Sequence, residues 1–126
     1  MIATSTEKPA ILIVEDHELV RDLLRLWIAR IFPSYVCLGA ESGEKAVELA
    51  RIKPFKLVVM DIGLPGINGI KATRSIKLDQ PTAQVVILSI FEENQFREDA
   101  AQAGAAGYIS KARMQTDLIP LLSTLL

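Results

Sequence analysis

The sequence predicts an α/β protein in which five strands alternate with five helices in one layered domain. Two observations support this fold class. The apolar runs at residues 10–14 and 57–60 contain no alternation of apolar and polar side chains, which is typical of strands buried on both faces in a parallel sheet. The segments between such runs carry apolar residues three or four positions apart, which indicates amphipathic helices joined to the strands by right-handed crossovers.

The first strand is expected at residues 10–14, and the most regular helix of the sequence follows it. From Glu18 to Phe32, apolar residues recur at three- and four-residue steps, so they share one face of a helix that Pro33 ends. A short strand is expected next, at residues 35–38.

The middle of the chain contains the second helix, the third strand and the third helix. Ser42 can cap a helix that extends to about Ile52, and Pro54 ends this segment. The strand at residues 56–60 carries a continuous apolar run that ends at Asp61, and it is expected at the centre of the sheet. The next helix is expected at residues 69–78.

The last third of the chain repeats the alternation of strand and helix. The strand expected at residues 83–88 is too β-branched and too short for a helix, and a helix at residues 92–103 follows it. The fifth strand is expected at residues 107–110. Because Pro120 lacks the amide that a helix interior needs, the last helix is expected to start near Thr116 or to be bent there.

Composition narrows the classes of function. The 126 residues are 50% hydrophobic and 23% charged with a net charge of −1, which argues against disorder, a basic nucleic-acid surface and a polybasic membrane contact. No apolar run approaches the ~20 residues that span a bilayer, and the start of the chain lacks the features of a signal peptide. We therefore expect a cytoplasmic protein with a frayed segment at 1–8 and a single domain at 9–126.

Polar residues follow four of the expected strands. Glu15 and Asp16 follow the first strand, Asp61 the third, Ser89 the fourth and Lys111 the fifth, so they should meet at one edge of a parallel sheet. Three carboxylates about 5 Å apart repel by roughly 3 kcal/mol per pair at an effective dielectric near 20, and oxygen ligands of this kind suit Mg²⁺. A neighbouring lysine and hydroxyl indicate a phosphoryl group, which an aspartate can accept as a nucleophile.

The same residues carry a resemblance to a known family. The order Glu15-Asp16, Asp61 with Pro65 four positions later, Ser89, and Tyr108-x-x-Lys111 resembles the receiver domain of two-component response regulators over about residues 9–126. The resemblance implies a doubly wound, flavodoxin-like (βα)5 fold with a five-stranded parallel sheet in the order 2-1-3-4-5.

The resemblance also implies a metal-dependent phosphoacceptor. Asp61 would take the phosphoryl group, and Asp16 and Asp61 would bind Mg²⁺ directly, with Mn²⁺ able to substitute. Glu15 would act mainly through water, and Gly63 would supply a backbone carbonyl. Such a domain is a signalling module rather than an enzyme, because it catalyses only its own phosphoryl transfer and slow self-dephosphorylation.

The remaining site residues would convert phosphorylation into a signal. By the resemblance, Ser89 and Lys111 bind the phosphoryl group, and Ser89 and Tyr108 form a switch pair that changes an output face made of the last two helices and the fifth strand. Phe91, which follows the fourth strand, is expected to line the phosphorylation site. A homodimer that depends on phosphorylation could form through the output face.

The segments Glu15-Asp16-His17 and 61–66 look most like receivers that precede a LuxR-type helix-turn-helix domain, the NarL/FixJ subgroup. This implies a sensor histidine kinase as partner and a transcriptional response. The segment itself would bind neither DNA nor membrane, because DNA would be contacted only by a C-terminal effector domain outside it. The alternative is a stand-alone or phosphorelay receiver that acts through protein–protein contacts.

Several simpler interpretations compete with this one. Asp16 could be an ordinary helix cap, and His17 a solvated neighbour without a catalytic role. A phosphohydrolase with an aspartyl nucleophile would need a second acid at position 63, which is glycine here. A nucleotide-binding module would need a glycine-rich phosphate loop, which the sequence lacks. A degenerate receiver used only for binding would not need the intact acids, Ser89 and Lys111.

Overall fold

The computed structural model describes residues 8–126. The frayed segment expected at 1–8 therefore lies outside the described residues, except for Lys8, whose Nζ donates a hydrogen bond to the carbonyl of Pro33 at 3.0 Å. Within the described part of the chain, no helix combines the length and the apolar character needed to cross a membrane.

Strands and helices alternate along the chain as the sequence predicts. The strands are β1 (Ala10–Val14), β2 (Val36–Ala40), β3 (Leu57–Met60), β4 (Gln84–Ser89) and β5 (Gly107–Ser110). The helices are α1 (Glu18–Ile31), α2 (Gly43–Ile52), α3 (Gly69–Asp79), α4 (Asn94–Gln102) and α5 (Met114–Leu125), with a short 3₁₀ turn at Lys111–Arg113. All pairings are parallel, and the strand order is β2-β1-β3-β4-β5, which confirms the predicted topology.

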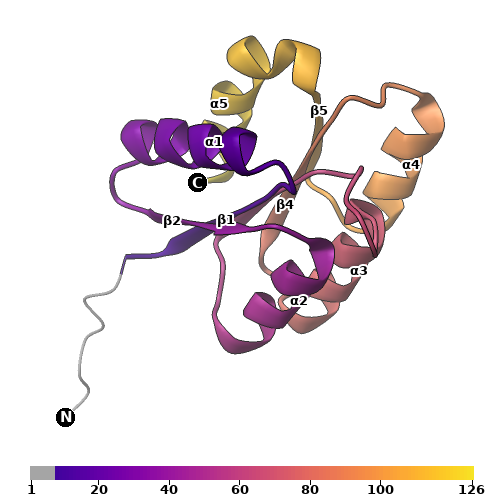
Figure 1. Ribbon diagram of the computed structural model, residues 1–126, viewed down its shortest axis with the longest axis horizontal. Helices are drawn as coiled ribbons and strands as arrows, with labels where there is room; N and C mark the ends of the chain where they lie inside the picture. Colours follow the sequence, from indigo (N-terminus) through magenta and orange to yellow (C-terminus); the bar gives the residue numbers. More distant parts are fainter. Residues whose placement is uncertain (1–7) are drawn as a thin grey trace.

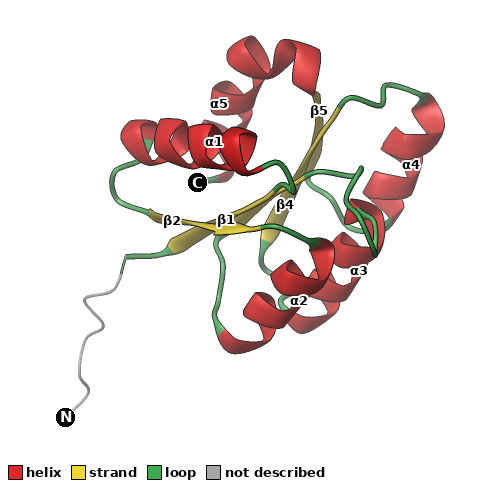
Figure 2. Ribbon diagram, viewed as in Figure 1, coloured by secondary structure: helices red, strands yellow, loops and turns green. Residues whose placement is uncertain are grey.

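The domain has three layers. In Figure 1, α1 and α5 lie on one side of the sheet, and α2, α3 and α4 lie on the other; Figure 2 shows the sheet between them. One apolar cluster joins alternate strand residues to α1 and α5, and a second joins the intervening residues to α2, α3 and α4. Every residue of β1 and β3 is buried, as expected for the two strands with continuous apolar sequences.

The register of the strands aligns their carboxyl ends. Val14 pairs with Met60, and Met60 pairs with Ile87, so the residues that follow β1 and β3 leave the sheet at the same level. Ser89 pairs with Ser110 two residues further along β4. The side chains that come after these strands therefore share one edge of the sheet, which lies at the centre of the view in Figure 1.

Several element boundaries differ from the prediction by one or two residues. β2 begins and ends later than expected, α4 is shorter at both ends, and β4 includes Ser89 as its last residue. Ser89 is therefore a fully buried strand residue rather than a residue of the following turn.

The last helix starts two residues before the expected position, and the bend predicted as the alternative stays a prediction. The helix begins at Met114, two residues before Thr116, because the 3₁₀ turn after β5 leads directly into it. Pro120 lies inside the helix at its seventh residue, where it removes one backbone hydrogen bond. Leu118 and Leu122 on either side of the proline are fully buried, and this packing keeps the helix in place despite the missing bond.

Candidate functional site

The three acidic residues predicted at the sheet edge come together. Glu15, Asp16 and Asp61 each offer one carboxylate oxygen within 4.8 Å of the other two. Glu15 is 3% exposed and Asp61 is 9% exposed, whereas Asp16 is exposed to solvent. Two of the three charges are thus removed from water, which makes a positive counter-charge necessary.

Lys111 supplies that counter-charge in the described structure. Its Nζ lies 2.7 Å from Oε1 of Glu15 and 3.3 Å from Oδ2 of Asp61. Burial lowers the pKa of Lys111, but the hydrogen bonds and charges of the two carboxylates outweigh it, so the pKa lies above the ordinary value of 10.5. On the alkaline side, the stabilisation that Lys111 gives is kept up to about pH 10.5 and is lost as the pH rises through the raised pKa.

The carboxylate of Asp61 is held from both sides. Oδ1 accepts a hydrogen bond from the amide of Gly63 at 3.1 Å, and Oδ2 faces Lys111. The amide of Asp61 itself continues the sheet by donating to the carbonyl of Val14 at 3.1 Å. The structure thus connects Gly63 to Asp61 through the amide of Gly63, and the predicted role of its carbonyl stays a prediction.

The loop after β4 contacts both residues of the predicted switch pair. Oγ of Ser89 accepts from the amide of Phe91 at 3.0 Å, and the hydroxyl of Tyr108 donates to the carbonyl of Phe91 at 2.5 Å. The guanidinium of Arg97 lies 4.6 Å from the centre of the Tyr108 ring. Ser89 and Tyr108 are therefore connected through a single residue, Phe91, and no sequence pattern predicts this connection.

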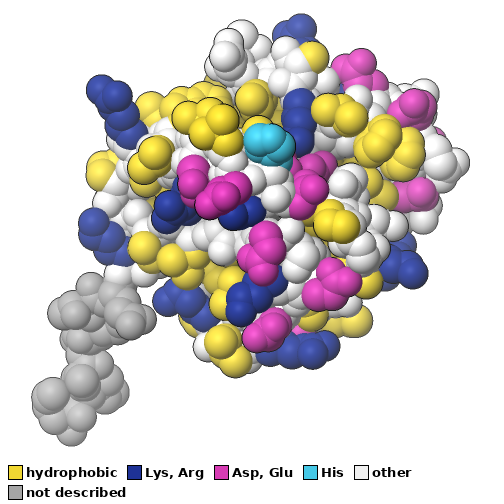
Figure 3. Space-filling model, in the orientation of Figure 1, with side chains coloured by type: hydrophobic (Ala, Val, Ile, Leu, Met, Phe, Trp, Pro, Cys, Tyr) yellow, Lys and Arg dark blue, Asp and Glu magenta, His cyan; other side chains and the backbone are white. Residues whose placement is uncertain are grey.

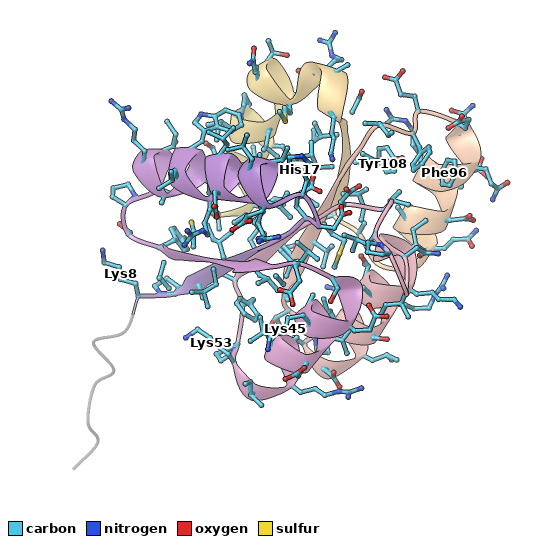
Figure 4. The ribbon with its side chains drawn as sticks, in the orientation of Figure 1. Lys8, His17, Lys45, Lys53, Phe96 and Tyr108 are labelled. Carbon is cyan, nitrogen blue, oxygen red and sulfur yellow. The ribbon has the colours of Figure 1, made fainter. Side chains whose placement is uncertain are left out.

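The ring of Phe91 lies beside the acidic site. A Cβ atom added to Gly63 would be 3.5 Å from Cε2 of Phe91 and 3.8 Å from Oδ1 of Asp61, so the ring and the carboxylate flank the same small space. The ring stacks on Phe96 of α4 with a centroid distance of 4.9 Å and an interplanar angle of 26°. Figure 4 places Phe96 and Tyr108 on the same side of the molecule, near α4.

The helix cap at the start of α1 is His17 rather than Asp16. The side chain of His17 accepts from the amide of Val20 through Nδ1 at 3.4 Å, and its own amide donates to Oε2 of Glu15 at 3.1 Å. The expectation that Asp16 could cap this helix was therefore wrong, and Asp16 remains available to a ligand. Figure 4 shows His17 at the start of α1, next to the sheet edge.

Arg21 also contacts the acidic site, although no sequence pattern predicts this contact. It lies one turn into α1, and its Nη1 donates to the carbonyl of Glu15 at 2.8 Å. In the sequence it looks like a polar residue on the solvent side of an amphipathic helix, so no pattern distinguishes it from Arg25 or Arg30.

The donor set indicates which ligands the site can hold. The three acids offer oxygen atoms only, a set that suits a hard divalent cation better than a transition metal that prefers nitrogen or sulfur. Lys111 adds a positive charge that can neutralise an anion. A carboxylate between a cation site and an ammonium group has the surroundings that a phosphoryl acceptor requires.

Comparison with known proteins agrees with this geometry. Residues 11–123 match the family model of the response regulator receiver domain. The chain is 42% identical over 102 residues to the response regulator GacA of Pseudomonas aeruginosa, and 37% identical over 109 residues to the response regulator UvrY of Escherichia coli. These alignments cover 80% and 86% of this chain but 47% and 50% of the two relatives, so the chain spans about half of their length.

Solved structures lead to the same assignment. A two-component response regulator of the LuxR family from Aurantimonas sp. SI85-9A1 superposes with a TM-score of 0.85 at 33% identity, covering 94% of this chain and 86% of that one. The response regulator TrrA from Thermotoga maritima, in complex with Mg²⁺-BeF, gives a TM-score of 0.82 at 28% identity over 94% of this chain and 99% of that one. The chain belongs to the response regulator receiver domains of two-component signalling, and its relatives support the LuxR-type subgroup.

Proposed function

We propose that Asp61 is the phosphoacceptor of this domain and that a sensor histidine kinase is its phosphodonor. The observation that carries the proposal is the position of the Asp61 carboxylate, which lies between two negatively charged carboxylates and the positively charged ammonium of Lys111. Asp61 shares the acidic cluster with Glu15 and Asp16, and Lys111 lies 3.3 Å from its Oδ2. A phosphodonor kinase that consumes ATP implies a cytoplasmic location.

We propose Mg²⁺ as the cation of the acidic cluster, with Mn²⁺ as a substitute. Asp16 and Asp61 would bind it directly, Glu15 through water and Gly63 through its carbonyl. When bound, the ion would neutralise charge on the incoming phosphoryl oxygens. The complex of TrrA with Mg²⁺-BeF, a relative at 28% identity, supports this choice.

The chain's own groups supply the rest of the transfer. Asp61 forms the new bond to phosphorus with a carboxylate oxygen, while the bond to the donor histidine breaks and its electron pair returns to the imidazole. Lys111 donates a hydrogen bond to a phosphoryl oxygen and offsets its charge. The domain thereby catalyses its own phosphorylation and, more slowly, the hydrolysis of its aspartyl phosphate by water.

We propose that phosphorylation reaches the output face through Phe91. Oγ of Ser89 accepts from the amide of Phe91, so the hydroxyl proton of Ser89 is available to a phosphoryl oxygen. A movement of Ser89 toward Asp61 would draw the backbone of Phe91 with it and strain the hydrogen bond from Tyr108. A difference of about 3 kcal/mol between the two states would shift their equilibrium more than a hundredfold.

The output is proposed to be transcriptional, through an effector domain beyond this segment and a homodimer that forms on phosphorylation. The LuxR-family neighbour and the greater length of the relatives support this. The alternative is a receiver that acts by protein–protein contact alone. The reading frame of the intact gene would distinguish the two. Sedimentation with and without beryllofluoride would test the dimer, and Ser89→Ala and Tyr108→Ala should both weaken it.

We propose that an apolar groove between α1 and α5 is a surface for the kinase. The groove has a volume of about 560 Å³ and is lined by Val20, Leu23, Leu24, Trp27, Met114 and Gln115, so it extends over the first ten residues of α1 and the start of α5. Figure 3 shows apolar side chains gathered over α1, near the single histidine. α1 begins three residues after Glu15 and α5 begins three residues after Lys111, so a kinase that reaches Asp61 can also contact the residues of this groove.

Phosphorylation assays would test the assignment of Asp61. With Mg²⁺ and a small phosphodonor, mass spectrometry should detect one added phosphate, and Asp61→Asn or a chelator should abolish it. A labelled Asp61→Asn protein would contradict the proposal. For the kinase surface, Leu23→Asp should slow transfer from a kinase about tenfold but leave labelling by the small donor unchanged, and Leu78→Asp on α3 should alter neither.

A further inference from the structure

Arg21 of α1 binds the backbone of the acidic site at Glu15. Its guanidinium reaches from α1 to the carbonyl of Glu15, with Nη1 at 2.8 Å from the oxygen. That carbonyl belongs to the peptide unit between Glu15 and Asp16, the two acids of the cluster that follow β1. The orientation of this peptide plane sets the directions in which both side chains leave the backbone.

Gly39 of β2 provides the space for this contact. A Cβ atom at Gly39 would lie 3.1 Å from Cδ, 3.3 Å from Cγ and 3.4 Å from Nε of Arg21, so the stem of the arginine lies directly on the glycine. Gly39 pairs with Ile13 in the sheet, and the next residue, Ala40, accepts from the amide of Glu15 at 3.0 Å. β2 therefore contacts the side chain of Arg21 at Gly39 and the backbone of Glu15 at the next residue, Ala40.

The other hydrogen bonds of Glu15 involve its side chain and its amide, and Arg21 binds its carbonyl. The carboxylate of Glu15 is bound by Lys111 and by the amide of His17, and the amide of Glu15 is bound by Ala40. These contacts fix the side chain and the amide of Glu15. Arg21 binds the carbonyl, and this bond orients the link to Asp16, whose side chain is exposed.

We propose that Arg21 is a positioning residue for the divalent cation: it holds the Glu15–Asp16 peptide in the orientation that directs both carboxylates to the cation site, and Gly39 admits its side chain. This inference rests on the proposed function of the acidic cluster. Groups that orient the ligands of a metal typically change its affinity about tenfold or more when they are removed.

Charge and position predict opposite results, which makes the inference testable. Arg21 is a cation close to a site for a cation, so if only its charge mattered, its removal would strengthen Mg²⁺ binding. If its position matters, removal weakens binding. Titration calorimetry with Mg²⁺ on Arg21→Met should therefore give a dissociation constant about tenfold higher than that of the parent domain. Binding that is equal or tighter would overturn the inference.

A second variant changes the position of Arg21 without changing the charge. Gly39→Ala introduces a methyl group against the stem of the arginine, so it should also raise the dissociation constant severalfold. Arg25→Met is the matched control, because Arg25 lies one turn further along α1 in an exposed ion pair with Asp22 at 3.6 Å. Its removal should leave Mg²⁺ affinity within about twofold of the parent.

Two further measurements, urea unfolding and Mg²⁺ binding by Asp16→Asn, separate the possible explanations. Urea unfolding of each variant identifies general loss of structure, and weak Mg²⁺ binding by a variant as stable as the parent supports the inference. If Arg21→Met does not fold, Gly39→Ala decides, and unchanged affinity there overturns the inference. If the parent domain and Asp16→Asn bind Mg²⁺ equally well, the proposed cation site itself is wrong, whatever the result for Arg21.

Discussion

The loops after β3 and β4 lie next to each other at the sheet edge but are held by different means. The loop after β3, residues 61–68, is fixed along its length. The amide of Gly69 donates to the carbonyl of Ile62 at 3.1 Å, and a carboxylate oxygen of Glu44 on α2 accepts from the amide of Ile67 at 3.1 Å. Asn68 then caps α3 by accepting from two amides of its first turn, each at 3.0 Å.

The loop after β4, residues 90–93, has fewer connections. Its backbone is held at Phe91 by Ser89 and Tyr108, the two residues of the predicted switch, while Ile90 is 70% exposed. The residue before α4, Glu93, makes no side-chain bond to the helix. α4 has one buried residue, Ala100, whereas α3 has five.

This difference matches two tasks that the site must perform. The loop after β3 presents the carboxylate that reacts, and a reacting group must keep its position to within a fraction of an ångström. The loop after β4 must take two positions if phosphorylation is to be detected elsewhere, and segments with few buried contacts open at the lowest cost. The next experiments test whether the two loops differ in this way.

The largest effect is expected from Gly69→Ala in the fixed loop. A Cβ atom there would clash with the carbonyl oxygen of Asp61, so the start of α3 must move away from the strand. We expect a loss of about 3 kcal/mol or more in the free energy of unfolding, measured with urea.

Gly63→Ala is the matched control for this substitution. Its added methyl group meets only ordinary contacts at 3.5 and 3.8 Å, so stability should change by less than about 1 kcal/mol. Equal losses for Gly63→Ala and Gly69→Ala would contradict the idea of a tight contact specific to the start of α3.

A smaller difference is expected between the two helix caps. Asn68→Ala removes the acceptor for two amides of α3 and should cost about 1 kcal/mol of unfolding free energy. Glu93→Ala at the same position of α4 removes no such bond and should change stability by less than about 0.5 kcal/mol. If the two losses were the same, the caps would not distinguish the loops.

The fold and the composition of the site could be predicted from the sequence because both depend on local patterns. Continuous apolar strands and periodic helices indicated the order of elements, and the ends of parallel strands must meet at one edge. Glu15, Asp61 and Lys111 follow such strands, so their proximity followed from topology. Resemblance to the receiver family then supplied the order of the strands.

The contacts that hold the site in place depend on side-chain directions that no local pattern contains. Arg21 reaches Glu15 only because Gly39 lies beneath it, and Phe91 links Ser89 to Tyr108 through its backbone. The start of the last helix at Met114 likewise depends on tertiary burial, which outweighs the local cost of Pro120. Contacts of this kind join different helices, strands and loops, so they can be identified only in the folded structure.

The next prediction concerns the hydrogen bond that holds the movable loop. Tyr108→Phe removes the hydroxyl that donates to the carbonyl of Phe91 but keeps the ring under Arg97. The bond contributes about 1 kcal/mol, so amide hydrogen exchange at residues 91–97 should become about fivefold faster, while the amides of α3 keep their rates. Tyr35→Phe, on the far side of the sheet, should alter neither group. Faster exchange in both helices would mean that the loops are not independent.

The smallest effect is expected on the lifetime of the aspartyl phosphate, and it tests whether the movable loop also protects the fixed one. Water must approach phosphorus in line with the bond to Asp61, and the ring of Phe91 lies beside the space above Gly63. Neither residue has a side chain that can deliver a proton, so access of water should limit hydrolysis.

Phe91→Ala should speed decay of the aspartyl phosphate about threefold, equivalent to less than about 1 kcal/mol, and Phe91→Glu should also change the rate. Ile90→Ala, one residue earlier and exposed, should not. The decay constant of purified phosphorylated protein measures all three. If it were unchanged in both Phe91 variants, the ring would have no part in the lifetime, and the loop after β4 would serve the signal alone.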